Sequence, residues 1–301
     1  MSIIETALEK LRRAGAPPST ESPAPVRRTT SKAAGPDAVG ARVPAPSPER
    51  PSKTIALDLG ALRRAGYLPD ERLERRFAEH YRRIKRPLIE RALAGGTDER
   101  LILVSSALPD DGKTFTSVNL ALSLARERDF SVLLIDADLS KGRISGVLGL
   151  REERGLAGAL ADESLDVESL VVRTDIAGLE ILPSGQSVED ATELLASARM
   201  SQLCARLGAS NPGRLIVIDS APLLAASEGR VLLAIPGQVV LVVRAGVTPQ
   251  RAVLDAVGLV DKNKLRGLIL NQAPLGSGEG KYGYSGYSGY GTLDDGRGGA
   301  G

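Results

Sequence analysis

The amino-acid sequence predicts an α/β protein built on a doubly wound, mostly parallel sheet. Short apolar runs alternate with helical segments between residues 101 and 271. Most of these runs are continuously apolar, which is typical of parallel strands covered by helices on both faces. Segments 115–128 and 191–209 are expected to form two of the intervening helices. The expected strands are LILVSS (101–106), SVLLID (131–136), GLEILP (178–183), RLIVID (214–219), QVVLVV (238–243) and RGLILN (266–271).

Two low-complexity segments flank this fold. Nine of the eighteen prolines lie within residues 15–52, and eleven of the thirty-three glycines lie within residues 276–301. We therefore expect a disordered linker at the first segment and a flexible tail at the second. Residues 1–14 carry a single apolar stripe and predict a short amphipathic helix. The remaining segments are a charged helical lead-in at 53–98 and the α/β domain at 99–275.

Composition excludes several classes of function. The formal net charge of +2 provides no bulk positive field, so no nucleic-acid partner is expected. One cysteine, Cys204, and one histidine, His80, exclude a disulfide framework, a multi-thiolate metal site and a Ser-His-Asp triad. No apolar run reaches the roughly 18 residues of a membrane span, and no signal peptide is expected at the N-terminus. These features predict a cytoplasmic protein.

The strongest chemical signal is ALPDDGKT at residues 107–114, between an expected strand and an expected helix. It follows the phosphate-binding pattern GxxxxGK(S/T), with Ala107 at the first glycine position. At such a turn Gly112 lets the backbone approach the phosphates. We expect Lys113 to reach the β- and γ-phosphates and the Thr114 hydroxyl to ligate Mg²⁺. The predicted nucleotide-binding residues of the loop are Ala107, Leu108, Pro109, Asp110, Asp111, Gly112, Lys113, Thr114 and Phe115.

Three carboxylates follow two of the expected strands. Asp136 and Asp138 follow the run SVLLI, and Asp219 ends RLIVID. The carboxyl ends of strands border the ligand crevice of a doubly wound sheet, so these groups are expected to lie close together. Mg²⁺ bound with a nucleotide would offset their repulsion, and one carboxylate would remain to accept a proton from a hydroxyl. Alternatively, each aspartate caps a following helix.

The motifs ALPDDGKT, VLLIDADLSKG and LIVIDSAP together resemble Walker A, Walker A′ and Walker B of bacterial protein-tyrosine autokinases, or BY-kinases. These are a ParA/MinD-like branch of the P-loop ATPases. The start MSIIETALEKLRRAG and the segment HYRRIKRPLIE are similar to soluble autokinases associated with exopolysaccharide and exosortase gene clusters. The resemblance covers nearly the whole chain apart from residues 15–52. It implies an ATP- and Mg²⁺-dependent autokinase that regulates exopolysaccharide synthesis or export.

The resemblance also implies roles for individual residues. Lys113 and Thr114 would bind the phosphates and Mg²⁺, with Lys113 acting in catalysis. Asp138 and Asp219 would hold or orient the metal, and Asp136 is the favoured base for the tyrosine hydroxyl. Asp138 is the second carboxylate expected to act in catalysis, and the assignment of roles among the three aspartates stays open.

Two further positions match the family outside the phosphate-binding motifs. Asn271 matches a position that contacts adenine. Glu79, Arg82 and Lys85 fall where the family has an ExxRxxR motif that mediates subunit contacts in a ring. The alternative for these three charges is a solvated helix face. We expect the helix that carries them to be interrupted at Pro87.

The sequence departs from the family pattern at several positions. Asp110 stands where glycine is usual, and Asp111 stands where glutamate is usual. Ser140 stands where arginine is usual, so any role of that arginine is missing. Lys85 in place of arginine keeps the charge but loses the bidentate fork. These departures bear on the kinase rate more than on ATP binding.

The tail places four tyrosines, separated by Gly and Ser, where no core can form. We expect Tyr282, Tyr284, Tyr287 and Tyr290 to be phosphoacceptors that enter the active site of a neighbouring subunit in trans. Each phosphate adds about −1.5 to −2 charges, so four would add roughly −6 to −8 to a chain of formal charge +2. Unmodified tails are therefore expected to hold a ring, and modified tails to release it. The alternative is a sticky tail without chemistry.

Partners and competing functions complete the expectations. The resemblance implies a separate membrane activator of the polysaccharide chain-length or export type, which would place the protein peripherally at the inner membrane. A tyrosine phosphatase is also expected. The helix at 1–14 would dock on its own domain, on a partner or on a membrane. One competing function is a ParA/MinD-like positioning ATPase, although its usual additional P-loop lysine is missing here. Another is a nucleotide-binding scaffold of an export complex without kinase activity.

Overall fold

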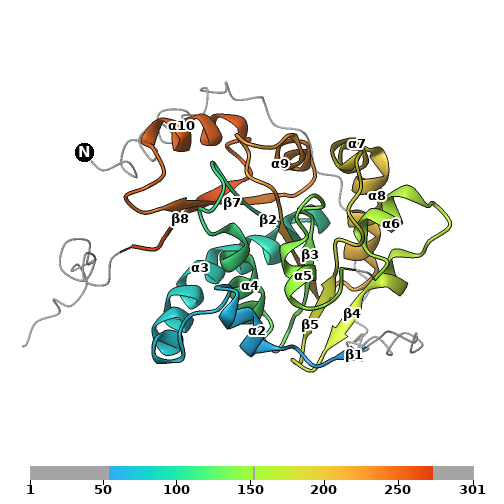
Figure 1. The fold of residues 1–301 in the computed structure, drawn as a ribbon, viewed down its shortest axis with the longest axis horizontal. Coiled ribbons are helices and arrows are strands. Elements are labelled where there is room, and N and C mark those ends of the chain that lie inside the picture. The colour runs from blue at the N-terminus through green and yellow to red at the C-terminus, as the bar shows by residue number, and fades with distance from the viewer. Residues whose placement is uncertain (1–53, 152, 274–301) are drawn as a thin grey trace, which may run out of the picture.

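The computed structural model describes residues 54–151 and 153–273 (Figure 1). The predicted helix at 1–14, linker at 15–52 and tail at 276–301 lie outside the described residues.

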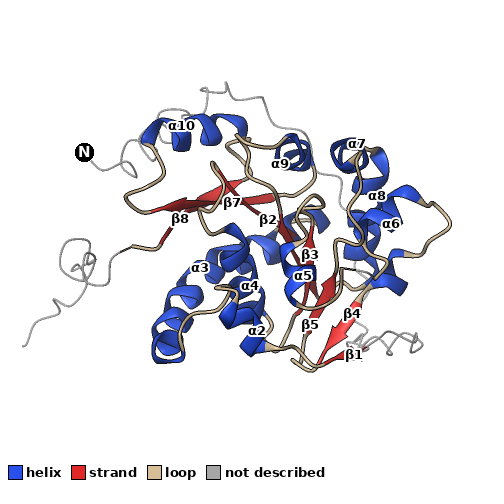
Figure 2. Cartoon of the chain, in the orientation of Figure 1, coloured by secondary structure: helices blue, strands red, loops and turns tan. Residues whose placement is uncertain are grey.

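A single sheet runs through the described part of the chain, with its strands in the order β1-β4-β5-β3-β6-β2-β7-β8 (Figure 2). Neighbouring strands from β5 to β8 pair in parallel, and β4 is antiparallel to β5. The predicted doubly wound, mostly parallel fold is confirmed. The two short strands β1 and β4 were not predicted, because two or three residues carry no recognisable period. The strands are β1 (Thr54–Ile55), β2 (Leu101–Ser106), β3 (Ser131–Asp136), β4 (Val172–Thr174), β5 (Leu179–Leu182), β6 (Arg214–Asp219), β7 (Gln238–Arg244) and β8 (Leu265–Asn271).

Successive residues of a strand point to opposite faces of the sheet, so the apolar strands have two faces to bury. Helices cover both faces and form a core on each. Leu103 packs in one core with α6, α7, α8 and α10, whereas Ile102 packs in the other with α2, α3, α4 and α5. The helices are α2 (Leu59–Arg64), α3 (Glu74–Ala94), α4 (Lys113–Leu124), α5 (Arg143–Val147), α6 (Leu156–Ala161), α7 (Ala191–Ala196), α8 (Ala198–Ser210), α9 (Ser227–Val231) and α10 (Gln250–Leu259). The 3₁₀ turns are η1 (Glu71–Leu73), η2 (Thr97–Arg100), η3 (Val167–Leu170) and η4 (Leu232–Ala234). Among the described helices, none is both long and apolar enough to span a bilayer.

The strand order brings the predicted motifs together. β6 lies between β2 and β3, so the strands that carry the three motifs are adjacent although they are far apart in sequence. Asp136 at the end of β3 stands beside Asp219 at the end of β6, and Asp219 in turn stands beside Val104 of β2. The carboxyl ends of these strands therefore form one edge, which is where ligands bind in open α/β sheets.

Helix α3 runs without a break through Pro87, so the predicted interruption is wrong. Proline removes the N–H that would bond to the carbonyl of Arg83. Both residues are exposed, so water can satisfy that carbonyl. On the opposite face Leu88 packs in the core, and its carbonyl accepts a 3.0 Å hydrogen bond from the Gln238 side chain. This packing holds the second half of α3 against the sheet.

Candidate active site

The phosphate-binding loop joins β2 to α4 as predicted. Lys113 and Thr114 are the first two residues of α4, so the unpaired N–H groups of its first turn face the loop. Gly112 has a φ of 99°, and a Cβ atom there would lie 1.8 Å from Nδ2 of Asn271. Asp110 also has a positive φ, 61°, which explains why glycine is the residue expected at that position. The backbone of the loop is thus held in a conformation that only particular residues tolerate.

Asp111 shapes the loop from within. Its carboxylate accepts a 3.0 Å hydrogen bond from the N–H of Leu108 and a 2.6 Å hydrogen bond from the hydroxyl of Thr248. The side chain amide of Asn271 donates to the backbone carbonyl of Asp111 over 3.0 Å. Asp111 was predicted among the nucleotide-binding residues, but its carboxylate is buried and engaged by the protein. The loop is therefore tied to the segment after β7 and to the end of β8.

Lys113 points its ammonium group toward the predicted acidic cluster. Its side chain is only 4% exposed, and Nζ lies 4.0 Å from Oδ2 of Asp138. A lysine this buried needs a negative partner, because an unpaired buried charge is costly. Asp138 serves as that partner in the protein alone, and the phosphates of a nucleotide would add further negative charge there.

Asp219 lies at the end of β6 with no exposed surface. Burial is the main cause that raises the pKa of its carboxyl to about 7, and repulsion from Asp136 adds to it. The charge of Lys113 and the hydroxyls of Thr114 and Ser117 act in the opposite direction. Ser117 donates to Oδ1 of Asp219 over 2.9 Å, and the Thr114 hydroxyl is also within hydrogen-bonding reach. Asp219 is therefore coupled to the residue predicted to ligate Mg²⁺.

Asp136 is held by the start of α5. Its Oδ2 accepts hydrogen bonds from the N–H and the hydroxyl of Ser145, at 2.9 and 2.7 Å. Burial raises the pKa of its carboxyl to about 6, although the two bonds from Ser145 favour the ionised form. The N-cap of α5 is Gly142, so Asp136 is not its capping residue, although it accepts a hydrogen bond from one of the unpaired N–H groups of the first turn. The other oxygen of Asp136 stays free to act.

The arrangement suits a bound Mg²⁺ ion. Asp136, Asp138 and Asp219 each keep one buried carboxylate oxygen without a hydrogen-bond partner. In the described segments, no three or more His, Cys, Asp or Glu side chains are grouped to hold a metal by themselves. Mg²⁺ at nucleotide sites is usually held by one or two carboxylates together with phosphates and waters, so the donor set fits. Thr114, Asp138 and Asp219 are the side chains that would hold Mg²⁺ if it binds here together with a nucleotide.

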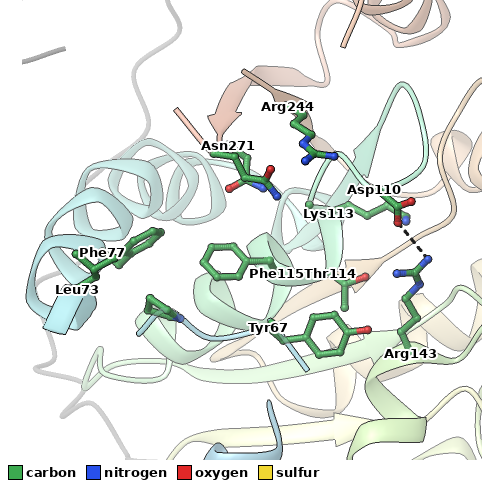
Figure 3. Close-up of a pocket in the computed structure, with 14 residues that line it drawn as sticks. Tyr67, Leu73, Phe77, Asp110, Lys113, Thr114, Phe115, Arg143, Arg244 and Asn271 are labelled. Atoms are coloured by element: carbon green, nitrogen blue, oxygen red, sulfur yellow. Dashed lines mark hydrogen bonds and ion pairs between the residues drawn. The ribbon is translucent and has the colours of Figure 1, made fainter. Parts of the chain in front are cut away.

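The loop opens onto a cavity of about 420 Å³ (Figure 3), which falls in the size range of small-molecule sites. The phosphate-binding loop forms one side, and the lead-in segment before and within α3 forms the other. Asn271, which the family resemblance assigns to adenine, lies at the rim at the end of β8. The lining residues are Gly66, Tyr67, Pro69, Leu73, Phe77, Asp110, Gly112, Lys113, Thr114, Phe115, Arg143, Arg244, Asn271 and Gln272.

Several of these residues were not predicted. Phe77 packs edge-on against Phe115, with ring centroids 5.6 Å apart and an interplanar angle of 75°. Together with Tyr67, Leu73 and Pro69 they line the apolar part of the cavity. Aromatic residues are scarce in this sequence, and this scarcity could have indicated the cavity. Outside the tail the chain has five aromatic residues, and three of them line this cavity. No motif marks Tyr67 or Phe77, because they belong to the lead-in rather than to the P-loop domain.

The expectation that an arginine is missing after Asp138 needs revision. Ser140 itself turns away, and its hydroxyl donates to the buried Glu228. Arg143, three residues later, lines the cavity. Its guanidinium lies 3.4 Å from Oδ1 of Asp110 and within hydrogen-bonding reach of the Tyr67 hydroxyl. A cation is therefore present at the cavity although the sequence pattern places none there.

Of the three predicted subunit-contact residues, Lys85 does not lie at the surface. It is 4% exposed, and Nζ donates to the carbonyl of Ser123 and pairs with Glu127 at 2.7 Å. The pattern misassigned it because a lysine stem on the inner side of α3 reaches across to the end of α4. Glu79 and Arg82 are exposed and pair with each other at 3.0 Å. Of the three residues, Glu79 and Arg82 are therefore the ones accessible at the surface for the predicted subunit contact.

Comparison with known proteins agrees with the nucleotide-binding features of the site. The sequence profile of the AAA domain family matches residues 100–255. Tyrosine-protein kinase YwqD of Bacillus subtilis is 32% identical over 196 residues, which cover 64% of this chain and 78% of that protein. The chain belongs to the bacterial protein-tyrosine kinase family. Succinoglycan biosynthesis transport protein ExoP of Rhizobium meliloti is also 32% identical, over 206 residues, which are 66% of this chain and 25% of ExoP.

A solved structure of a kinase domain is similar to this chain. The kinase domain of VpsO is 32% identical, and the match covers 68% of this chain and all of that domain with a TM-score of 0.56. The chain spans about a quarter of the length of several other curated relatives in the family. The family resemblance and the P-loop fold expected from the sequence are thus confirmed.

Proposed function

We propose that this protein is an ATP-dependent protein-tyrosine kinase that phosphorylates tyrosines of its own C-terminal tail. The observation that carries the proposal is the meeting of Lys113 with three buried carboxylates at the start of α4. This set provides a cation for the phosphates, a place for Mg²⁺ and a carboxylate to accept a proton. Kinase names among the relatives that share this domain support the same activity.

Each residue has a part in the proposed reaction. Lys113 and the N–H groups of the first turn of α4 bind the phosphates and offset their charge. Mg²⁺, when bound, neutralises charge that develops between the β- and γ-phosphates. Thr114 and Asp219 orient the metal, and Asp138 positions Lys113 and completes the metal site. The free oxygen of Asp136 accepts the proton of the tyrosine hydroxyl, and a pKa near 6 suits a group that gains and loses a proton near neutrality.

The position of the tail favours its tyrosines as acceptors. Asn271 and Gln272 line the cavity, so the chain leaves the described domain at the rim of the site. From Asn271 to Tyr282, eleven residues span at most roughly 40 Å when extended. We propose that the tail enters the site of a neighbouring subunit, with Glu79 and Arg82 contributing to the contact between subunits. Phosphorylation of the four tyrosines would then release the tails, because the added charge faces an acidic site.

The direct test uses γ-labelled ATP and Mg²⁺ with the full chain. We expect label on tail tyrosines, loss of label in Lys113→Met, and loss of label when Tyr282, Tyr284, Tyr287 and Tyr290 are all changed to Phe. Phosphate release without labelled protein would instead indicate a positioning ATPase. Nucleotide binding without turnover would indicate a regulatory scaffold.

A mixture of two variants, neither of which can label itself, tests whether transfer occurs between chains. Lys113→Met supplies an acceptor tail without a working site, and the four-Phe variant supplies a working site without an acceptor. Transfer in trans predicts that mixing restores label on the Lys113→Met chain. A mixture that stays unlabelled, although wild-type protein labels itself, would contradict the exchange of tails between subunits.

The cellular role is proposed from the relatives. ExoP is named for succinoglycan biosynthesis and transport, which supports a role in the regulation of exopolysaccharide synthesis or export. We propose that a separate membrane protein of an export system activates the kinase and holds it at the membrane, and that a tyrosine phosphatase reverses the modification. Deletion of the chromosomal gene should lower exported polysaccharide, and Lys113→Met should reproduce that loss at unchanged protein abundance.

A further inference from the structure

Arg143 is a cation of the cavity that the phosphate-binding motifs do not include. It is the first residue of α5, directly after the turn that Asp138 begins. Its side chain lines the same cavity as Lys113 and Thr114. Figure 3 shows the guanidinium pointing toward Asp110 of the phosphate-binding loop.

Two groups hold the guanidinium at this place. Asp110 pairs with it at 3.4 Å, and the Tyr67 hydroxyl lies within hydrogen-bonding reach. The Tyr67 backbone is itself fixed, because its N–H donates to the carbonyl of Leu62 and its carbonyl accepts from the Asn119 side chain, both at 2.8 Å. The Asp110 side chain is 66% exposed and that of Arg143 is 35% exposed. Ion pairs between such accessible groups are weak, so a phosphate can replace Asp110 as the partner of the guanidinium.

Three cationic side chains, those of Arg244, Lys113 and Arg143, line the cavity at different positions. Arg244 lies beside Asn271 on the side predicted for adenine, and Lys113 lies between Arg244 and Arg143 (Figure 3). Arg143 stands on the opposite side, at the start of α5, between the turn that Asp138 begins and Ser145, whose N–H donates to Asp136. In the proposed reaction Asp136 accepts the proton of the acceptor hydroxyl, and Asp138 and Asp219 lie at the metal site. The γ-phosphate and the acceptor hydroxyl must therefore meet near these carboxylates. Arg143 is thus at the reacting end of the cavity.

We propose that Arg143 contacts the transferred γ-phosphoryl group and stabilises the charge on its oxygens during transfer. The inference rests on the proposed kinase function. In that reaction the tyrosine oxygen bonds to the γ-phosphorus while the bond from this phosphorus to the oxygen of ADP breaks. The hydroxyl proton passes to an aspartate, and Arg143 stays protonated throughout. A planar guanidinium suits phosphate oxygens because it donates two parallel hydrogen bonds, which an ammonium group does not.

The test compares Arg143→Ala and Arg143→Lys with Arg244→Ala, a cation of the same cavity on the other side. We expect Arg143→Ala to lower kcat for tail phosphorylation by at least about 100-fold, since arginines at the transferred phosphoryl group contribute this much or more. Its affinity for ADP should stay within about threefold of wild type, which also shows that the domain is folded. Arg143→Lys should recover only part of kcat. Arg244→Ala, in contrast, should weaken ADP binding.

A binding measurement separates this inference from the kinase function itself. The affinities of wild type and Arg143→Ala are compared for ADP and for a non-hydrolysable ATP analogue in the presence of Mg²⁺. The proposal predicts that Arg143→Ala loses about tenfold in affinity for the analogue and little for ADP, even if wild type phosphorylates no tyrosine. Equal losses for both nucleotides, no loss for either, or a kcat within threefold of wild type would overturn the role of Arg143.

Discussion

The two walls of the cavity are built in opposite ways. The inner wall, residues 107–115 with the ends of β3 and β6, is largely buried, and its polar groups bond mainly to one another. The outer wall, residues 66–77 with Arg143, is mostly half-buried or exposed and touches the inner wall through a ring contact and a weak ion pair. A rigid inner wall is prepared for the phosphates, whereas the outer wall has the freedom to adjust to an acceptor.

The largest expected difference between the walls is the effect on nucleotide affinity of replacing a glycine in each. Gly112→Ala should lower nucleotide affinity by at least about 100-fold, because it combines a positive φ with a Cβ that meets Asn271. Gly66 on the outer wall also has a positive φ, 77°, but nothing lies within 4 Å of an added Cβ. Gly66→Ala should therefore cost about 1 kcal/mol of stability and leave nucleotide affinity within about threefold. Calorimetric titration with ADP would measure both, and similar affinities for the two variants would contradict the distinction between the walls.

Helix α3, which supports the outer wall, carries one buried residue expected to affect stability, Lys85, and one exposed residue expected to affect it little, Arg82. Lys85→Ala should lower the free energy of unfolding by about 2 kcal/mol, because Glu127 and the carbonyl of Ser123 lose a buried partner. Arg82→Ala removes only an exposed pair and should cost about 0.5 kcal/mol or less.

Denaturant unfolding and sedimentation measure the two effects separately. If α3 mediates assembly, Arg82→Ala should reduce the size of the oligomer while stability stays near that of wild type. A large loss of stability in Arg82→Ala, or none in Lys85→Ala, would contradict this assignment.

The acidic cluster of the inner wall predicts a dependence of stability on pH. Burial raises the pKa of Asp136 to about 6 and that of Asp219 to about 7, so the folded chain holds protons that the unfolded chain releases. In the absence of nucleotide, the free energy of unfolding should fall as pH rises from about 4 to 7, by roughly 2 to 3 kcal/mol per carboxyl.

Asp219→Asn is the matched variant for this effect. It cannot ionise, so it should gain stability relative to wild type at pH 8 and gain less at pH 5. Chemical unfolding at both values measures the difference. A gain that is equal at the two pH values would show that the ionisation of Asp219 does not strain the fold.

The sequence predicted the inner wall much better than the outer wall, for physical reasons. The turn that ends in Gly112 and Lys113 needs particular residues in adjacent positions, and the aspartates follow apolar strands, so both leave a local pattern. Arg143 and Phe77 reach the cavity only because α3 and α5 pack on the same face of the sheet. Their roles depend on tertiary contacts that no short motif records.

Other differences follow from the same limit. The continuous course of α3 through Pro87 depends on the exposure of one carbonyl to water, and the burial of Lys85 depends on the distant end of α4. The role of Asp111 depends on Thr248, which is far along the chain. Periodicity predicts that a helix or strand exists, but only the packed structure shows which of its side chains turn inward.

The most direct test of the central claim is a residue-by-residue map of phosphate after the full chain has reacted with ATP and Mg²⁺. Tandem mass spectrometry should find phosphate on Tyr282, Tyr284, Tyr287 or Tyr290 in wild type and none in Lys113→Met. Turnover of ATP by wild type that leaves all four tail tyrosines unmodified would contradict the account.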